Sequence, residues 1–295
     1  MTGPLTCGIC SGPLTLRYSG GAPSLVSEAF APSCHSLSGY GDLYACARCG
    51  TIQQPDLPKG RELHELYRNM RDDAYLVEED GRRRTARRVL DAVERHGTRG
   101  RMLDVGCGHG LLLDEARARG WQVAGLEISS ASRAYASEDL GLDIRDATLD
   151  ELDPATDGGF DAIVLADVLE HLDDPVAALK QIARLLAPGG VACVVTPDPA
   201  SLTARLAGRR WWGYLRSHTF LVPRSTLREL LRDAGLEPVE EKQLRRSFTF
   251  GCWVGGLGER SGPLARAFDV IRRLGIASRH LTMALGDERV VVARR

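Results

Sequence analysis

The stretch MLDVGCGHG, Met102–Gly110, decides how the rest of the chain is interpreted. It places a short apolar strand directly before Gly-x-Gly-x-Gly, a turn that lets the backbone approach a nucleotide-like ligand closely. A dinucleotide fingerprint needs its third glycine at position 111, which is Leu111, whereas the third glycine here is Gly110. The stretch also lacks the Gly-Lys-Ser/Thr ending of a phosphate-binding P-loop. The turn is therefore predicted to hold a different ligand.

From about residue 99 onward, apolar strand patterns alternate with amphipathic helix patterns. FDAIVLADV (160–168) is a near-continuous apolar run, typical of a strand buried on both faces of a parallel sheet. DPVAALKQIARLLAPGG (174–190) predicts a helix with Pro175 near its start and the Pro-Gly-Gly sequence beyond its end. Further strands are expected at WQVAGLEI (121–128), GLDIRDA (141–147), GVACVVTPD (190–198) and DERVVVARR (287–295). The alternation predicts an α/β fold, a doubly wound Rossmann-like sheet whose ligands bind beyond the carboxyl ends of the strands.

An acidic residue, Glu127, stands at the tip of the strand that follows the glycine turn. From there a carboxylate can accept hydrogen bonds from both hydroxyls of a ribose. The bare glycines let the backbone approach the ligand, and the start of the next helix can face a carboxylate. A second acid, Asp104, lies inside the strand before the turn.

These motifs resemble those of class I S-adenosylmethionine-dependent methyltransferases, from about Arg99 onward. LDVGCGHG is close to that family's glycine motif, LEIS to its second-strand acid, and FDAIVLADVLEHLDDP with LLAPGGVACVVTPD to its fourth and fifth strands. The resemblance implies a seven-stranded sheet and S-adenosylmethionine as the methyl donor. The implied contacts are Asp104, Gly106, Gly108 and Gly110 at the methionine half, Glu127 at the ribose, Asp146 at the adenine amine and Asp167 near the donor. An ordinary turn acid is the alternative for Asp146.

Methyl transfer from a sulfonium is an in-line displacement, and a hydroxyl acceptor also needs a base. The candidate base is His171, just beyond the fourth strand, because its unperturbed pKa of about 6.5 suits proton removal near neutrality. Glu170 would orient it or act itself, and His218 is the second candidate. The alternative is that His171 only caps or packs locally. Three nearby aromatic residues either stack on the acceptor or form the loop's own small core: Trp211, Trp212 and Tyr214.

Two Cys-x-x-Cys pairs, Cys7 with Cys10 and Cys46 with Cys49, lie in the loop-rich first 58 residues. Four thiolates in a small segment suit a closed, structural zinc site that contributes to folding. Cys34 and His35 lie between the pairs and are alternative ligands. With CARCGTIQQP, this segment resembles the metal module of deoxysugar C-methyltransferases. The expected domains are a zinc module (1–58), a helical linker covering the acceptor side (59–98) and a methyltransferase domain (99–295) with an insertion at about 248–286.

Composition restricts the partners. The 295 residues are 43% apolar and 26% charged with a net charge of -1, so there is no global attraction to nucleic acid. No run of about 18 apolar residues could span a membrane, and no secretory signal begins the chain. We therefore expect a cytoplasmic protein whose eight cysteines are metal ligands or buried thiols rather than disulfides.

Two basic helical patterns leave alternatives open. RRRTARRVLDAVERHG (82–97) puts Arg83, Arg87 and Arg88 off an apolar face formed by Ala86, Val89, Leu90 and Val93. The arginines are either a solvated helix face or a phosphate-binding patch. PLARAFDVIRRLGIASRH (263–280), within the insertion, predicts a lid, a homodimer contact or a helix lying on an anionic membrane.

The acceptor is expected to be a small molecule. The fourth strand ends in ADVLEHL and not in the Asn/Asp-Pro-Pro-Tyr/Phe motif of enzymes that methylate nucleic-acid amines. The core instead resembles small-molecule methyltransferases such as those of quinone biosynthesis. This favours a hydroxyl of a sugar, glycolipid or polyketide-type natural product. The alternatives are an rRNA methyltransferase with a zinc module, a sugar C-methyltransferase, and a protein that binds the donor without catalysis.

Overall fold

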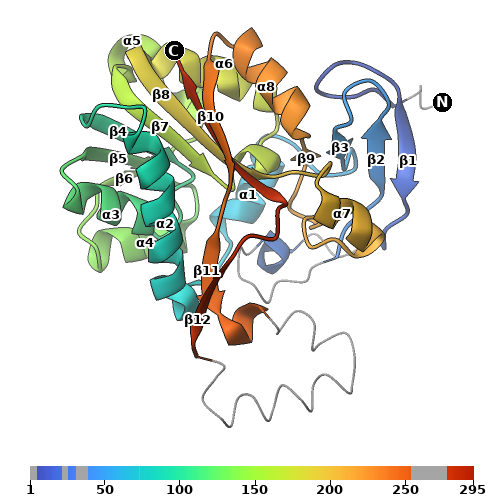
Figure 1. Cartoon of the computed structure of the whole chain (residues 1–295), viewed down its shortest axis with the longest axis horizontal. Coiled ribbons are helices and arrows are strands. Elements are labelled where there is room, and N and C mark those ends of the chain that lie inside the picture. Colours follow the sequence, from blue (N-terminus) through green and yellow to red (C-terminus); the bar gives the residue numbers. More distant parts are fainter. Residues whose placement is uncertain (1–4, 22–25, 31–38, 73, 254–277) are drawn as a thin grey trace.

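The computed structural model describes residues 5–21, 26–30, 39–72, 74–253 and 278–295. Its centre is a seven-stranded sheet with the strand order β10-β13-β8-β7-β4-β5-β6, flanked by helices (Figure 1). The strands from β8 to β6 in this order are parallel, and β13 runs antiparallel to both of its neighbours, β8 and β10. The fold predicted from the alternating pattern is therefore confirmed. The strands are β4 (Arg101–Val105), β5 (Gln122–Leu126), β6 (Ile144–Arg145), β7 (Phe160–Ala166), β8 (Leu186–Pro197), β10 (Glu237–Gln243) and β13 (Glu288–Arg294).

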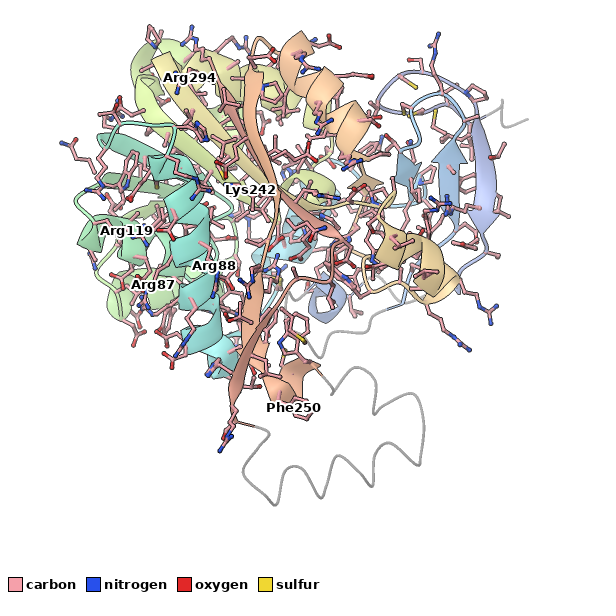
Figure 2. The ribbon with its side chains drawn as sticks, viewed as in Figure 1. Arg87, Arg88, Arg119, Lys242, Phe250 and Arg294 are labelled. Carbon is pink, nitrogen blue, oxygen red and sulfur yellow. The ribbon has the colours of Figure 1, made fainter. Side chains whose placement is uncertain are left out.

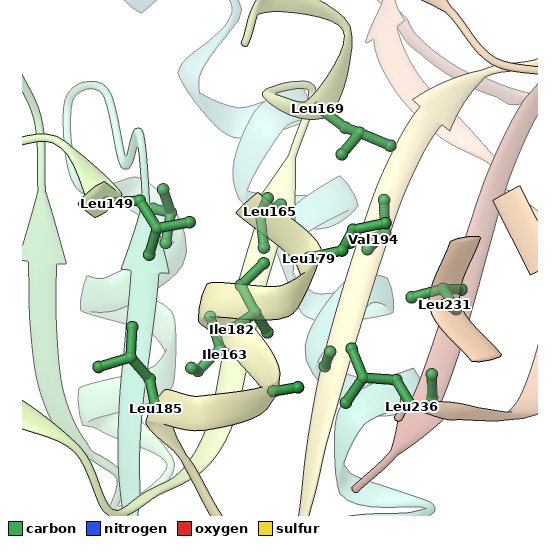
Figure 3. Packing of buried hydrophobic residues seen from close by; sticks show 14 of the residues in the cluster. Leu149, Ile163, Leu165, Leu169, Leu179, Ile182, Leu185, Val194, Leu231 and Leu236 are labelled. Atoms are coloured by element: carbon green, nitrogen blue, oxygen red, sulfur yellow. The ribbon is translucent and has the colours of Figure 1, made fainter. Parts of the chain in front are cut away.

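The apolar run of β7 is buried on both faces of the sheet. Ile163 and Leu165 pack on one side against the helices α6 and α8, which Figure 3 shows from close by. Ala162 and Val164 pack on the other side against α2 and α3. Each large apolar side chain buried in this way contributes roughly 1.5–3 kcal/mol. The helices are α2 (Glu79–Glu94), α3 (Leu111–Ala118), α4 (Ser130–Glu138), α5 (Pro154–Asp157), α6 (Pro175–Leu185) and α8 (Arg224–Asp233).

The helix α6 begins as predicted and ends earlier than expected. The Asp174 carboxylate accepts a hydrogen bond from Ala177 N at 2.9 Å, and Pro175 occupies the first turn, where its missing N–H costs nothing. The chain then enters β8 at Leu186, so the Pro-Gly-Gly sequence belongs to the strand. A register shift against β7 accommodates this irregular start. The predicted third strand, β6, is also shorter than its sequence pattern suggested.

Two arginines of α2 form ion pairs with acidic residues of the neighbouring helix α3. Arg83 lies 2.8 Å from Asp114, and Arg87 lies 2.7 Å from Glu115. Arg88, which Figure 2 labels beside Arg87, instead donates to the hydroxyls of Ser247 at 3.0 Å and Thr282 at 3.3 Å. The apolar face of the helix is buried as predicted: Ala86, Val89, Leu90 and Val93. Because carboxylates already pair with two of these arginines, the solvated helix face is the better interpretation.

The N-terminal segment forms a second, four-stranded sheet beside the first, in the order β1-β2-β3-β9 (Figure 1). Its last strand, β9, comes from a segment more than 160 residues later in the chain. The short helix α1 follows this sheet, and α7 precedes β9. These elements are β1 (Leu14–Tyr18), β2 (Leu43–Cys46), β3 (Ile52–Gln53), α1 (Arg61–Arg68), α7 (Leu202–Ala207) and β9 (Phe220–Leu221).

A two-stranded sheet, β11 (Arg246–Thr249) with β12 (His280–Met283), lies at the two ends of the predicted insertion (about 248–286). The expected basic amphipathic helix at 263–280 falls almost wholly outside the described residues, as do Cys34 and His35. Within the described part of the chain, no helix has the length and apolar character needed to cross a bilayer. Cys252 is disulfide-bonded, which departs from the expectation that no cysteine would be.

Candidate active site

A cavity of about 1220 Å³ opens at the carboxyl ends of β4, β5, β7 and β8. This is where ligands of a doubly wound sheet bind. One part of it is lined by the glycine turn and the tip of β5, and another by His171, His218 and side chains from β11 and β12. The cavity therefore joins the predicted donor and acceptor residues in one space.

The glycine turn after β4 follows a path that glycine adopts most easily. The backbone φ angles of Gly106, Gly108 and Gly110 are 64°, 53° and 78°. A Cβ atom on Gly106 would lie 2.9 Å from Val168 Cγ2, whereas one on Gly108 would meet nothing within 4 Å. The turn is thus packed from behind at Gly106 and leaves free space at Gly108.

Gly110 differs from the prediction that it lines the donor site. It precedes α3 in the left-handed conformation, and a Cβ atom there would lie 2.7 Å from Leu142 Cδ1. It is not among the described residues that line the cavity. Its glycine is required by the close packing of α3 against the segment before β6.

Glu127 holds the glycine turn with its carboxylate. Oε2 accepts from Gly108 N at 2.8 Å, and Oε1 accepts from Ser129 N at 2.7 Å. Burial raises the pKa of Glu127, and these backbone N–H groups act in the opposite direction. A carboxylate has about four acceptor positions, so both oxygens can still accept from a ligand hydroxyl. Burial, followed by the charge of Glu127, raises the pKa of nearby Asp104 well above its usual range.

Asp146 does not face the cavity. It follows β6, and its carboxylate accepts from Arg68 at 2.7 and 2.9 Å and from Arg133 at 2.8 Å. Its side chain is 41% exposed, and it is not among the described residues lining the cavity. In this arrangement the carboxylate bonds to arginines outside the cavity in which the predicted adenine contact would form. The two arginines draw the carboxylate to the outer surface, which agrees with the alternative of a turn acid.

Asp167 lies in the cavity wall at the end of β7 with a positive φ of 58°. Both of its carboxylate oxygens lie 2.6 Å from Nη2 of Arg246. Arg246 also donates through Nε to Glu288. Burial raises the pKa of Glu288 to about 7, against the lowering effect of Arg246. Arg246 comes from β11 and lies outside the motifs that carry the family resemblance, so its place in the site was not predicted.

His171 is held through one ring nitrogen. Its Nδ1 lies 2.9 Å from the carbonyl oxygen of Ser217 and 2.8 Å from the hydroxyl of Tyr67. Because a carbonyl oxygen only accepts, Nδ1 carries the proton in the neutral ring, and Nε2 keeps a lone pair. Burial lowers the pKa of His171, although the Ser217 carbonyl acts to raise it. The ring is therefore neutral and able to take up a proton at pH 7.

His218 and Glu170 complete this part of the wall. His218 donates from Nδ1 to Gly213 O at 2.7 Å, and its ring centre lies 4.8 Å from that of His171. Burial and then the neighbouring His171 lower the pKa of His218 to about 3. Glu170 Oε2 accepts from Thr196 at 2.9 Å, and burial raises its pKa well above the usual range. Among the described residues Tyr67, rather than Glu170, contacts Nδ1 of His171.

Comparison with known proteins identifies the family. Residues 77–241 match the family model described as a methyltransferase domain. The chain belongs to this family. A ubiquinone biosynthesis O-methyltransferase of Cereibacter sphaeroides is 32% identical over 173 residues, covering 54% of this chain and 68% of that relative. One from Ruegeria pomeroyi is 32% identical over 175 residues, with the same two coverages. The protein is an S-adenosylmethionine-dependent methyltransferase.

A solved structure shares the fold of this methyltransferase. The N-methyltransferase NodS from Bradyrhizobium japonicum WM9, in complex with S-adenosyl-L-homocysteine, has a TM-score of 0.51 at 18% identity. The alignment covers 80% of this chain and 97% of that one. At this identity the likeness supports the fold alone.

The aromatic residues before β9 are divided between two roles in this methyltransferase. Trp211 and Tyr214 are buried in a small core with Leu43, Ile52 and Leu221, as the alternative interpretation predicted. The indole nitrogens of Trp211 and Trp212 both donate to Asp287 Oδ2, at 2.7 and 2.6 Å. Both tryptophans also line the cavity, so they join its wall to the N-terminal sheet.

The four cysteines converge as their spacing predicted. The Sγ atoms of Cys7 and Cys49 are 3.6 Å apart and those of Cys10 and Cys46 are 3.5 Å apart, and all four lie within 4.8 Å of one another. Sulfurs about 2.3 Å from one zinc ion at tetrahedral corners would be about 3.8 Å apart. Burial would raise the pKa of Cys46, but backbone N–H groups of Cys49 and Arg48 lower it to about 7. The donor set therefore fits a structural zinc ion.

Cys46→Ser is expected to lose most of the bound zinc and to unfold at a lower temperature, because a serine hydroxyl replaces one thiolate of a closed site. Affinity for the methyl donor should stay within about twofold, since the cysteines lie outside the cavity. Metal analysis, thermal unfolding and calorimetry measure the three quantities. Cys193→Ala, which removes a buried thiol of the large sheet, is the control that should keep its zinc. Full zinc content in Cys46→Ser would refute the assignment.

Proposed function

We propose that this methyltransferase transfers a methyl group to a hydroxyl oxygen of a small molecule, with His171 as the base. The observation that carries the proposal is the fixed ring of His171. Ser217 and Tyr67 hold its Nδ1 and leave Nε2 as the acceptor, and His171 lines the same cavity as Glu127 and the glycine turn. A base so placed is needed for a hydroxyl acceptor and is dispensable for an amine with a free lone pair.

When bound, S-adenosylmethionine supplies an electrophilic methyl group, whose transfer breaks a carbon–sulfur bond and forms an oxygen–carbon bond. Glu127 and the backbone of the glycine turn would hold this donor, and His171 Nε2 would take the hydroxyl proton. The Ser217 carbonyl would then stabilise the imidazolium through Nδ1–H. His218, with a pKa of about 3, stays neutral and would accept a hydrogen bond from the acceptor without titrating.

The acceptor half of the cavity favours an amphiphilic compound. Its wall carries aromatic and apolar side chains next to the acids and Arg246: Trp211, Trp212, Phe248, Phe250, Trp253, Leu281 and Met283. Rings of this kind pack on sugar or polyketide faces, while the polar groups meet hydroxyls. The relatives named as ubiquinone biosynthesis O-methyltransferases support an oxygen acceptor. We therefore propose a sugar, glycolipid or polyketide-type natural product as the substrate.

We also propose the division of the chain into three parts, based on the order of its elements and their contacts with the site. Residues 1–58 would form the zinc module, 59–98 the helical cover that supplies Tyr67, and 99–295 the methyltransferase domain. The pairing of β3 with β9 joins the first of these to the last.

The purified protein with methyl-labelled S-adenosylmethionine should methylate hydroxyl compounds in a panel of glycosides, glycolipids and polyketides. Mass spectrometry and NMR then locate the new methyl group. We expect an O-methyl product whose formation depends on His171. A methyl group attached to a ring carbon would favour the C-methyltransferase alternative. Methylation of rRNA, with no methylation of any small hydroxyl compound in the panel, would contradict the proposal.

A further inference from the structure

The N-terminal sheet reaches into the wall of the active site through one strand pairing. Ile52 pairs with Leu221 and Gln53 with Phe220, so β3 and β9 lie side by side as antiparallel strands. The nine residues that precede β9, Trp211–Thr219, are here called the acceptor segment. They supply His218 and the Ser217 carbonyl that fixes His171. Where this segment lies therefore determines where both histidines lie.

Gln54, directly after β3, holds the acceptor segment in place through hydrogen bonds. Its side chain is buried, and its Nε2 donates to the carbonyl oxygens of Leu215 and His218, both at 2.7 Å. Its Oε1 accepts from Gly41 N at 2.7 Å, and its backbone N–H donates to Thr219 O at 3.2 Å. One side chain thus satisfies two carbonyls of the loop that carries His218.

The preceding residue connects the same strand to the cysteine cluster. Gln53 donates from Nε2 to Cys7 Sγ at 3.2 Å, and its Oε1 accepts from Gly8 N at 3.1 Å. On the other side of the cluster, the hydroxyl of Thr226 donates to the carbonyl of Cys49 at 2.6 Å. Gln53 bonds to a sulfur of the cluster and the next residue, Gln54, bonds to the carbonyl of His218. Two adjacent residues therefore connect the cysteine cluster to His218.

We infer that Gln54 is a positioning residue for the acceptor half of the active site, and that the four-cysteine module is the frame that holds it in place. The inference rests on the proposed function, because it acts through His218 and His171. A closed metal site that takes no part in the chemistry would then control turnover through the geometry of the acceptor segment. The donor half, built on β4 and β5, does not depend on it.

Fluorine NMR tests the inference without relying on catalysis. With 5-fluorotryptophan incorporated, Trp211 and Trp212 report on the acceptor segment, and Trp121, which donates to Glu94 at 3.0 Å, reports on the large sheet. Gln54→Leu should shift or broaden the resonances of Trp211 and Trp212 and leave that of Trp121 unchanged. It should also lower kcat about tenfold with an unchanged donor Kd. Removal of zinc with a chelator under reducing conditions should affect the same two resonances.

Two further variants make the test decisive. Gln54→Glu keeps the size and the acceptor for Gly41 N but cannot donate to the two carbonyls, so it should reproduce the changes even if Gln54→Leu fails to fold. Gln181→Leu is the matched control: Gln181 is also buried and donates to a backbone carbonyl, that of Leu152 at 2.6 Å, and its loss should leave Trp211 and Trp212 unchanged. Wild-type resonances for Trp211 and Trp212 in Gln54→Glu would overturn the inference. If no hydroxyl compound is methylated, the proposed function fails while the fluorine result still stands.

Discussion

Glu127→Ala is expected to weaken binding of S-adenosylmethionine by about 100-fold or more. The carboxylate would accept hydrogen bonds from two ribose hydroxyls, each contributing about 1.5–3 kcal/mol because the acceptor is charged, and 1.4 kcal/mol corresponds to a factor of ten. The same carboxylate accepts from Gly108 N and Ser129 N, so its loss also releases the glycine turn. Isothermal calorimetry with S-adenosylhomocysteine, the demethylated product, measures the effect without turnover.

Asp146→Ala is the matched control for this prediction. Both acids follow neighbouring parallel strands, but Asp146 is paired with Arg68 and Arg133 outside the cavity. Its loss should change the donor Kd by less than about twofold, because surface ion pairs contribute roughly 0–1 kcal/mol. Thermal unfolding of both variants separates an unstable protein from a damaged site. Equal loss of affinity in the two variants would show that the adenine contact predicted for Asp146 forms in solution after all.

The large sheet was predictable because its signals are local in the sequence. The apolar run of β7 and the glycines after β4 each predict their local structure from fewer than ten consecutive residues. The paired cysteines were equally clear, because a Cys-x-x-Cys turn brings its own two sulfurs together wherever the rest of the chain goes. Such features depend on residues that are close in the sequence, so the tertiary structure does not change them.

The direction of a single side chain after a short strand is a weaker signal. β6 contains only two residues, Ile144 and Arg145. This is too short for the alternation of buried and exposed side chains to predict which way Asp146 points. Two arginines from other helices decide it. In contrast, Glu127 follows a five-residue strand, and backbone N–H groups close to it in the fold hold its carboxylate.

The supports of the acceptor histidines could not be predicted from the sequence. Tyr67 lies 104 positions before His171, and Gln54 lies 164 positions before His218. Neither residue belongs to a recognisable motif, and a lone tyrosine or glutamine carries no pattern. Their contacts arise when α1 and the N-terminal sheet pack against the large domain. The sequence thus indicates which histidines are candidates, while only the tertiary structure shows how they are oriented.

His171→Ala is expected to lower kcat by about 100-fold to 10,000-fold, the usual contribution of a general base, with the donor Kd within about twofold of wild type. Steady-state kinetics with a hydroxyl acceptor and calorimetry with S-adenosylhomocysteine measure the two quantities. His96→Ala is the control: His96 pairs with Glu240 at 2.9 Å, away from the cavity, and its loss should leave kcat unchanged.

The pH dependence of kcat/KM distinguishes a base from a packing residue. Burial lowers the pKa of His171 below its ordinary value of 6.5, so the neutral, proton-accepting form prevails above that lowered pKa. Activity should therefore be level from about pH 6.5 to 8 and should fall only at lower pH, where His171 becomes protonated. In His171→Ala the residual rate should lose this acidic limb. If the limb persists in the variant while kcat is reduced, another group titrates there, and His171 serves only to shape the acceptor pocket.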